Sequence, residues 1–197
     1  MVVLDGQIYM VGGATEWWEP AMSVVEAYDL AEGVWKPKAD LPTPRIRLTA
    51  GVVRGRIYAI GGQDKGNAAG AIPTVEEYDP DRAAWETKAN MPTGRIGAAA
   101  VVVDEKIYVI GGWSNARIGE WTEVYDPQRD SWTIQAGMRR MRAYLTATVL
   151  DGVIYAIGGA DPEVSLTTVE TFDTGVRSRP VSPSGKAVSV WGSLKHP

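Results

Sequence analysis

Carboxylates recur at one register along the chain, and paired acids of this kind can donate and abstract protons. In four places a Glu lies two residues before an aromatic residue, and an Asp directly follows that aromatic residue. The acids are Glu26, Glu76, Glu123 and Glu170, with Asp29, Asp79, Asp126 and Asp173. A catalytic pair is needed only once, so four symmetric copies favour an architectural role. An Asp at a turn commonly accepts hydrogen bonds from its own backbone.

Other catalytic and metal-binding groups are scarce in the 197 residues. There is no Cys, and the one His is His196, next to the last residue. The sequence therefore offers no thiol nucleophile, no sulfur-based metal site, no credible Ser-His-Asp triad and no His-rich metal centre. The net charge of −4 disfavours non-specific binding to nucleic acid. We expect no metal and no cofactor, and a binding role rather than catalysis.

A sequence repeat of 47 to 50 residues positions these groups. Its anchors are a Gly pair, a later aromatic residue and, in three repeats, a Trp. The Gly pairs are Gly12 and Gly13, Gly61 and Gly62, Gly111 and Gly112, and Gly158 and Gly159. The aromatic residues are Tyr28, Tyr78, Tyr125 and Phe172, and the Trp residues are Trp35, Trp85 and Trp132. The interval from Gly pair to aromatic residue varies between 14 and 17 residues, which indicates a surface loop.

Each repeat is predicted to form four short strands. In the second repeat, β-branched apolar runs at 49–53 and 57–60 flank a hairpin turn at 54–56. A third strand covers 74–78, and a fourth begins at Trp85. The Gly pairs predict positive φ or a close backbone approach. The repeated Tyr and Trp rings are expected to fill the space between neighbouring sheets.

Four strands per repeat make one blade of a β-propeller. The Gly doublet, the Glu-x-Tyr-Asp segment and the following Trp resemble the kelch repeat over nearly the whole chain. This resemblance implies an all-β, kelch-type propeller with four blades' worth of four-stranded antiparallel sheets. Kelch propellers usually have six or seven blades, so four could form a small closed ring or a partial propeller. An open arc would expose apolar blade faces and favour self-association.

The spacing predicts one propeller over residues 1–175, with repeats at about 1–41, 42–91, 92–138 and 139–175. Residues 176–197 form a C-terminal tail. The position expected to hold a fourth Trp is Arg179, and prolines interrupt the strand expected there. Two alternatives follow for the tail: residues 188–191 supply a delayed outer strand that closes the last blade, or the tail is loose.

Three Arg residues lie 16 residues before a Gly pair, at Arg45, Arg95 and Arg142. They are expected at the start of each innermost strand, where they converge near the propeller axis. In kelch adaptors that bind acidic peptides, Arg residues at this repeat position line the central pocket, and the resemblance implies the same role here. Forked guanidinium groups suit carboxylate recognition. The alternative is that each Arg pairs with a framework Asp or Glu of its own blade.

Binding residues are also expected in loops. Because strands in a blade alternate in direction, the loop after the second strand and the link after the fourth emerge on one face. The loops on this face are 14–23, 63–73, 113–121 and 160–166, and they contain Trp17, Trp18, Trp113 and Trp121. Recognition explains these Trp residues better than framework packing does. We therefore expect a non-catalytic module that binds a protein, an acidic peptide or a glycan through this face.

The second-ranked reading is an enzyme. The kelch propeller also occurs in copper-dependent galactose oxidase, but that copper site needs a Cys-linked Tyr and His ligands that this sequence lacks. A kelch-type sialic acid epimerase or mutarotase remains an alternative, because Arg, Glu or Asp could transfer protons. The first residues carry no secretory signal, and no apolar run is long enough to span a membrane. A cytoplasmic location is the default expectation.

Overall fold

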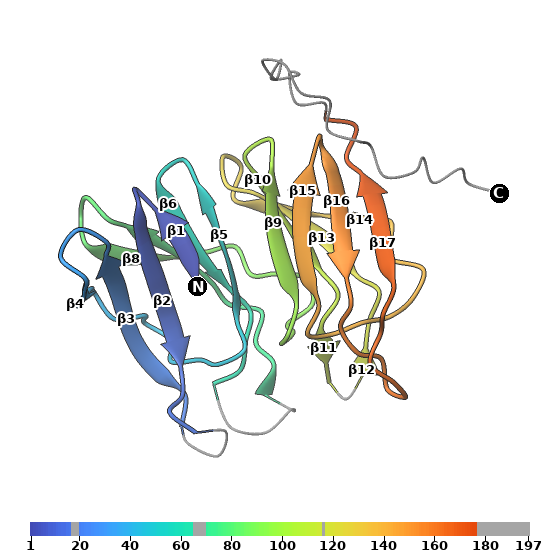
Figure 1. Ribbon diagram of the computed structural model, residues 1–197, viewed down its shortest axis with the longest axis horizontal. Coiled ribbons are helices and arrows are strands. Elements are labelled where there is room, and N and C mark those ends of the chain that lie inside the picture. Colours follow the sequence, from blue (N-terminus) through green and yellow to red (C-terminus); the bar gives the residue numbers. More distant parts are fainter. Residues whose placement is uncertain (17–19, 65–69, 116, 177–197) are drawn as a thin grey trace.

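Four antiparallel sheets are arranged around a common axis in a computed structural model, which describes residues 1–16, 20–64, 70–115 and 117–176 (Figure 1). Each sheet is one blade, and the blades follow each other in chain order from blade 1 to blade 4. Each predicted repeat range contains one of these sheets. The fold class predicted from the sequence, an all-β kelch-type propeller with four blades' worth of sheet, is confirmed.

The strands are short and consecutive within each blade. Blade 1 contains β1 (Val2–Leu4), β2 (Gln7–Gly13), β3 (Met22–Asp29) and β4 (Val34–Pro37). Blade 2 contains β5 (Thr49–Val53), β6 (Arg56–Ile60), β7 (Val75–Asp79) and β8 (Ala84–Lys88). Blade 3 contains β9 (Ala99–Val103), β10 (Lys106–Ile110), β13 (Thr122–Asp126) and β14 (Ser131–Gln135). Blade 4 contains β15 (Thr146–Leu150), β16 (Val153–Ile157) and β17 (Val169–Asp173). The short strands β11 (Trp113–Ser114) and β12 (Arg117–Ile118) form a hairpin in a loop of blade 3.

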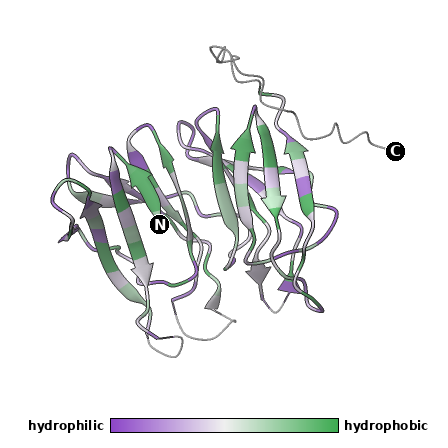
Figure 2. Ribbon diagram, viewed as in Figure 1, coloured by the Kyte–Doolittle hydropathy of each residue, from purple (hydrophilic) through white to green (hydrophobic). Residues whose placement is uncertain are grey.

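Side chains alternate across each strand, so every blade has two faces. We call the face toward the preceding blade the trailing face and the face toward the next blade the leading face. In β10, Ile107 and Val109 are buried on the trailing face, whereas Tyr108 and Ile110 are buried on the leading face. An inner blade is therefore apolar on both faces, which explains the hydrophobic strands in Figure 2.

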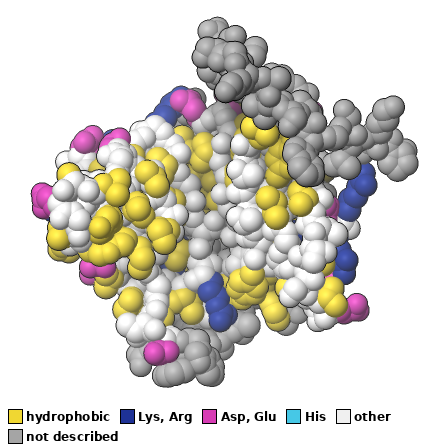
Figure 3. Space-filling view, in the orientation of Figure 1, with side chains coloured by type: hydrophobic (Ala, Val, Ile, Leu, Met, Phe, Trp, Pro, Cys, Tyr) yellow, Lys and Arg dark blue, Asp and Glu magenta, His cyan; other side chains and the backbone are white. Residues whose placement is uncertain are grey.

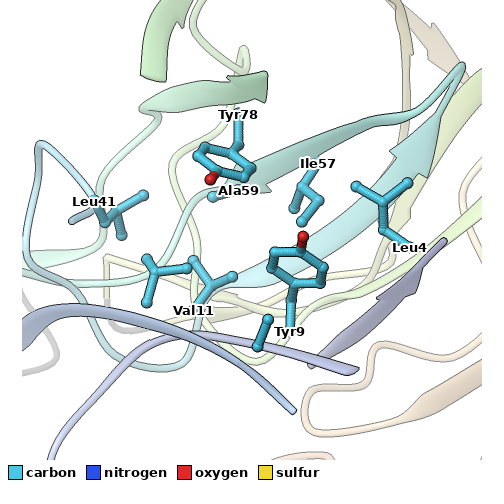
Figure 4. Close-up of a cluster of buried hydrophobic side chains, with 9 residues drawn as sticks. Leu4, Tyr9, Val11, Leu41, Ile57, Ala59 and Tyr78 are labelled. Carbon is cyan, nitrogen blue, oxygen red and sulfur yellow. The ribbon is translucent and has the colours of Figure 1, made fainter. Parts of the chain in front are cut away.

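The space between blades 1 and 2 shows how two faces pack (Figure 4). Tyr9 and Val11 of β2 meet Ile57 and Ala59 of β6, together with Tyr78 of β7. The ring centroids of Tyr9 and Tyr78 lie 6.2 Å apart, with the ring planes tilted by 55°. Burying each large apolar side chain stabilises the fold by about 1.5–3 kcal/mol. Equivalent ring pairs occupy the later interfaces, Tyr58 with Tyr125 and Tyr108 with Phe172.

The outer-strand Trp joins a blade to the one before it. Trp85 Nε1 donates a hydrogen bond to the carbonyl of Ala39, and Trp132 Nε1 donates to the carbonyl of Ala89, both at 2.9 Å. Both rings pack against the neighbouring core, as predicted. The same prediction is wrong for Trp35, which is 44% exposed. No described blade covers the trailing face of blade 1, so the ring of Trp35 has no neighbouring core to pack against.

The Gly pairs bring the inner strands close to the link that enters the next blade. Gly61 and Gly62 have φ of +64° and +94°. A Cβ on Gly61 would lie 2.7 Å from the carbonyl oxygen of Arg95, closer than real Cβ atoms approach. The amide of Gly62 donates to that same carbonyl at 2.9 Å. The sequence-based expectation of positive φ and close backbone approach is confirmed.

The Asp after each aromatic residue shapes the turn between the third and fourth strands. Asp29 Oδ1 accepts hydrogen bonds from the amides of Ala31 at 2.9 Å and Glu32 at 3.2 Å. Lys36 and these backbone amides lower the pKa of Asp29. Equivalent bonds form at the later turns, to Asp79 and to Asp126. The expectation that these Asp residues accept hydrogen bonds from the backbone of their own turns is confirmed.

The blades pack in series, with β1 against β5, β5 against β9, and β9 against β15. Hydrophobic side chains gather over the sheets at both ends of this series (Figure 3). Blade 4 has three strands among the described residues, and the predicted tail strand at 188–191 lies outside them. Within the described ranges, no helix is long and apolar enough to cross a membrane.

Candidate ligand-binding site

The described parts of the four predicted binding loops lie at one edge of the propeller, the lower edge in Figure 1. The hairpin of β11 and β12 belongs to this edge. The links that enter blades 2, 3 and 4 reach the same edge, because short bridges join each link to the residue after a Gly pair. These bridges are Ile46 with Gln63, Ile96 with Trp113, and Ala143 with Ala160. We call this edge the loop edge.

The three Arg residues identified from the sequence are buried, and at most 1% of the surface of each residue is exposed. Arg45 Nη2 lies 2.6 Å from Glu76 Oε2, and Arg45 Nη1 donates to the carbonyl of Thr74 at 2.8 Å. Arg95 and Arg142 pair in the same way, with Glu123 at 3.1 Å and with Glu170 at 2.5 Å.

Burial lowers the pKa of the Arg45 guanidinium, although the charge of Glu76 opposes that effect. The carboxylate of Glu76 also accepts a hydrogen bond from Thr43 Oγ1 at 2.7 Å. Each of these Arg residues therefore pairs with a framework Glu of its own blade, which is the second of the two arrangements that the sequence leaves open. The geometry gives the three guanidinium groups a structural partner and leaves them no exposed surface.

A different repeat position reaches solvent near the axis, two residues after each buried Arg. It holds Arg47, Gly97 and Tyr144, whose φ values are +55°, +61° and +55°. The amide of Gly97 donates to the carbonyl of Arg47 at 3.1 Å, and the amide of Tyr144 donates to the carbonyl of Gly97 at 2.7 Å. These bonds link three successive blades. The left-handed backbone leaves the side chains of Arg47 and Tyr144 exposed.

A pocket of about 600 Å³ opens at the loop edge between blades 3 and 4. One wall is the β11–β12 hairpin with Glu120, and the other comprises residues 160–162 of blade 4. Met141 and Tyr144 of the intervening link complete the lining. Tyr144 is 51% exposed and Met141 is also exposed, so apolar surface is accessible to a ligand.

The structure brings the two described loop Trp residues, Trp113 and Trp121, to this pocket in different ways. Trp113 lines it, and its Nε1 is a buried donor without an acceptor in the described structure. Trp121 lies behind the wall, with the guanidinium carbons of Arg95 and Arg117 at 5.6 Å and 5.1 Å from its ring. Trp121 thus supports Arg117, which lines the pocket. Trp17 and Trp18 lie outside the described residues.

Charges of both signs border the pocket. Asp161 accepts hydrogen bonds from the amides of Val164 and Glu163, both at 2.9 Å, and these bonds lower its pKa. Arg140 Nε also donates to Asp161 at 2.7 Å. On the opposite wall Arg117 lies 3.9 Å from Glu120. In the described part of the chain, no cluster of three or more His, Cys, Asp or Glu residues is arranged to hold a metal ion.

Sequence reasoning missed Arg47, Tyr144 and Arg117. One signal was present: Gly97 stands where the other repeats have Arg47 and Tyr144, and a Gly at that position is compatible with the left-handed backbone that all three adopt. No comparable signal marks Arg117, because the hairpin that carries it has only two residues per strand.

Comparisons with known proteins agree with the repeat. A family model described as the KLHDC2/KLHL20/DRC7 Kelch-repeats domain matches residues 1–178. The F-box/kelch-repeat protein At2g29830 of Arabidopsis thaliana is 37% identical over 68 residues, which are 34% of this chain and 18% of that protein. Kelch-like ECH-associated protein 1B of Danio rerio is 41% identical over 59 residues, which are 30% of this chain and 10% of that protein.

The matches therefore span less than a fifth of these relatives' own lengths. Their names do not favour the epimerase alternative. Among solved structures, that of YjhT superposes with a TM-score of 0.71 at 19% identity, covering 89% of this chain and 66% of YjhT. That likeness shows the fold alone.

Proposed function

Because the chain belongs to the kelch-repeat family, we propose that it is a protein-interaction module that binds a peptide segment of its partner at the loop edge. The observation that carries this proposal is the pocket between blades 3 and 4, which is lined by Trp113, Tyr144 and Met141. Binding sites combine apolar and aromatic lining with a few polar groups that fix orientation. The β11–β12 hairpin forms one wall, and two backbone hydrogen bonds between Ala143 and Ala160 join the other wall to the link.

The lining supports a peptide with a large apolar anchor residue. Tyr144 and Met141 offer exposed apolar surface, and interface hot spots are enriched in aromatic residues. Trp113 adds a third large apolar side chain to the same lining.

The charges at the loop edge support an acidic residue beside that anchor. Arg117 is exposed and rests against the ring of Trp121, which limits its rotamers. Arg47 is exposed near the axis. Arg binds carboxylates through two parallel hydrogen bonds. An acidic peptide therefore fits this edge, although Arg45, Arg95 and Arg142 do not contact it.

Selection from a displayed random-peptide library against the intact chain tests the proposal, with a glycan array in parallel. Kd is then measured for an enriched peptide by titration calorimetry. We expect Tyr144→Ala and Arg117→Ala each to weaken binding at least tenfold, or about 1.4 kcal/mol. Ile134→Ala is the matched control, because it removes an exposed apolar side chain from β14, the outer strand of blade 3, away from the pocket. It should leave Kd within twofold.

If all three variants bind the peptide with the Kd of the unsubstituted chain, the peptide binds elsewhere and this site is rejected. Enrichment of glycans without any peptide would reject the peptide ligand and support the glycan alternative.

A further inference from the structure

The interfaces between blades are built from equivalent positions, with one exchange: in blade 3 the position of Val75 holds Thr122, and Val124 enters the apolar cluster instead. Between blades 2 and 3, Tyr58 and Ile60 of β6 and Val75 of β7 form the leading face, and at most 4% of each is exposed. They pack on Ile107 and Val109 of the next blade. This repetition defines what a complementary face must carry: a Tyr and two branched aliphatic residues on the leading side, aliphatic residues and a ring on the trailing side.

The leading face of blade 4 carries the same residue types, and no other blade covers it within the described part of the chain. Tyr155 and Ile157 of β16 and Val169 of β17 occupy the positions of Tyr58, Ile60 and Val75. Ile157 is 38% exposed and Val169 is 52% exposed. A contiguous apolar sheet face of this kind on a folded protein marks an association surface.

The trailing face of blade 1 is the matching surface. Ile8 and Met10 of β2 and Tyr28 of β3 occupy the positions that Ile107, Val109 and Tyr125 hold in blade 3. Met10 is 42% exposed, whereas the inner residues at these positions are fully buried. Val3 of β1 is exposed beside them.

The aromatic rings identify the pairing. Each of the three inner interfaces joins a leading-face Tyr to a trailing-face ring at a centroid distance of 5.7 to 6.2 Å. Two members of this series have no ring of another blade beside them among the ring pairs of the described chain: Tyr155 on the leading face of blade 4, and Tyr28 on the trailing face of blade 1, which contacts Trp35 of its own blade. One chain therefore presents both halves of an interface that it already builds three times, but at opposite ends of its row of blades (Figure 1).

We propose that the leading face of blade 4 binds the trailing face of blade 1 in a second copy of this chain, so that copies associate head to tail. The contact continues the blade packing from one chain into the next and brings Tyr155 of one copy to Tyr28 of the other. Such an interface is heterologous, since each copy contributes a different surface. It therefore extends by whole chains or closes into a ring.

Two single substitutions separate the surfaces. Ile157→Glu places a charge on the leading face of blade 4, and Met10→Glu places one on the trailing face of blade 1. Light scattering after size-exclusion chromatography measures the mass of each protein over a range of concentrations. The unsubstituted chain should rise above the monomer mass of 21.3 kDa in steps of one chain. Each variant alone should remain a monomer, because its copies share the same blocked face.

A mixture of the two variants is the decisive sample. It retains one intact pair of faces, so it should form a dimer of twice the monomer mass and stop there. Self-association of Ile157→Glu alone would show pairing between like faces and overturn the proposal. A monomeric unsubstituted chain at the highest concentration would overturn it as well. Ile134→Glu, on the exposed outer strand β14, should behave as the unsubstituted chain.

Circular dichroism confirms that each variant keeps its strands. Val3→Glu and Val169→Glu, at exposed positions on the same two faces, provide a second pair with the same expected masses. If the second pair fails to form the mixed dimer while folded, the proposal is also rejected.

Discussion

The buried Arg–Glu pairs show how one residue type can serve two roles that sequence alone does not separate. Arg45 and Arg47 are two residues apart, yet the first is buried against Glu76 and the second is exposed. The spacing predicted that an Arg would stand near the axis in three of the four repeats, and it left both a ligand role and a pairing role open. Whether a side chain of this link points into the core or into solvent depends on the left-handed backbone conformation at Arg47. The sequence does not reveal that conformation where the residue is not a Gly.

The pair of Arg45 and Glu76 should contribute strongly to stability as a unit. We expect Glu76→Ala to lower the free energy of unfolding by about 3–5 kcal/mol, because it leaves a buried guanidinium without its counter-charge. Urea denaturation followed by circular dichroism measures this loss. Glu86→Ala is the matched control, since Glu86 pairs with Arg82 in solvent and its loss should leave the free energy of unfolding nearly unchanged. Similar losses of unfolding free energy for the two variants would show that the buried pair stabilises the fold no more than the exposed pair does.

At the scale of elements, hydrophobic alternation and turn residues were sufficient to predict where most strands lie in the sequence. The segments predicted at 49–53 and 57–60 are β5 and β6 to within one residue. The β11–β12 hairpin was not predicted, because two-residue strands have no measurable period and their pairing depends on the neighbouring link. The burial of Trp35 was also predicted wrongly, since its repeat position is equivalent to Trp85 but its blade has no described neighbour on that side.

The Gly pairs give a prediction that compares two equivalent elements. In Gly61→Ala the new Cβ would meet the carbonyl of Arg95 in the next blade, and we expect a loss of about 3 kcal/mol. In Gly158→Ala the nearest atom is the carbonyl of Leu166 at 3.5 Å, so only the backbone strain at φ +62° remains, about 1–2 kcal/mol. Thermal unfolding of both variants tests the difference. A loss for Gly158→Ala as large as that for Gly61→Ala would mean that the close approach between blades is unimportant.

At the scale of the whole molecule, the repeat count predicted the number of blades and the edge where variable loops meet. It did not predict how the end blades are covered, because the repeat fixes what each blade face carries and not which surface meets the last face. Both the exposed end faces and the pocket between blades 3 and 4 follow from the way the blades stack. An end blade has one face that no described blade covers, and the loops at the edge of the stack are free to form a pocket. Inner sheets shield one another's apolar faces, while the loops at their edge vary in length and composition without disturbing that core.

Hydrogen–deuterium exchange of the intact chain, with and without a peptide selected against it, tests the central claim most directly. If the loop edge between blades 3 and 4 binds the partner, the peptide should slow exchange in residues 113–121, 139–145 and 159–162, with little change elsewhere. Protection confined to the opposite edge, at the β5–β6 and β9–β10 turns, would contradict the account.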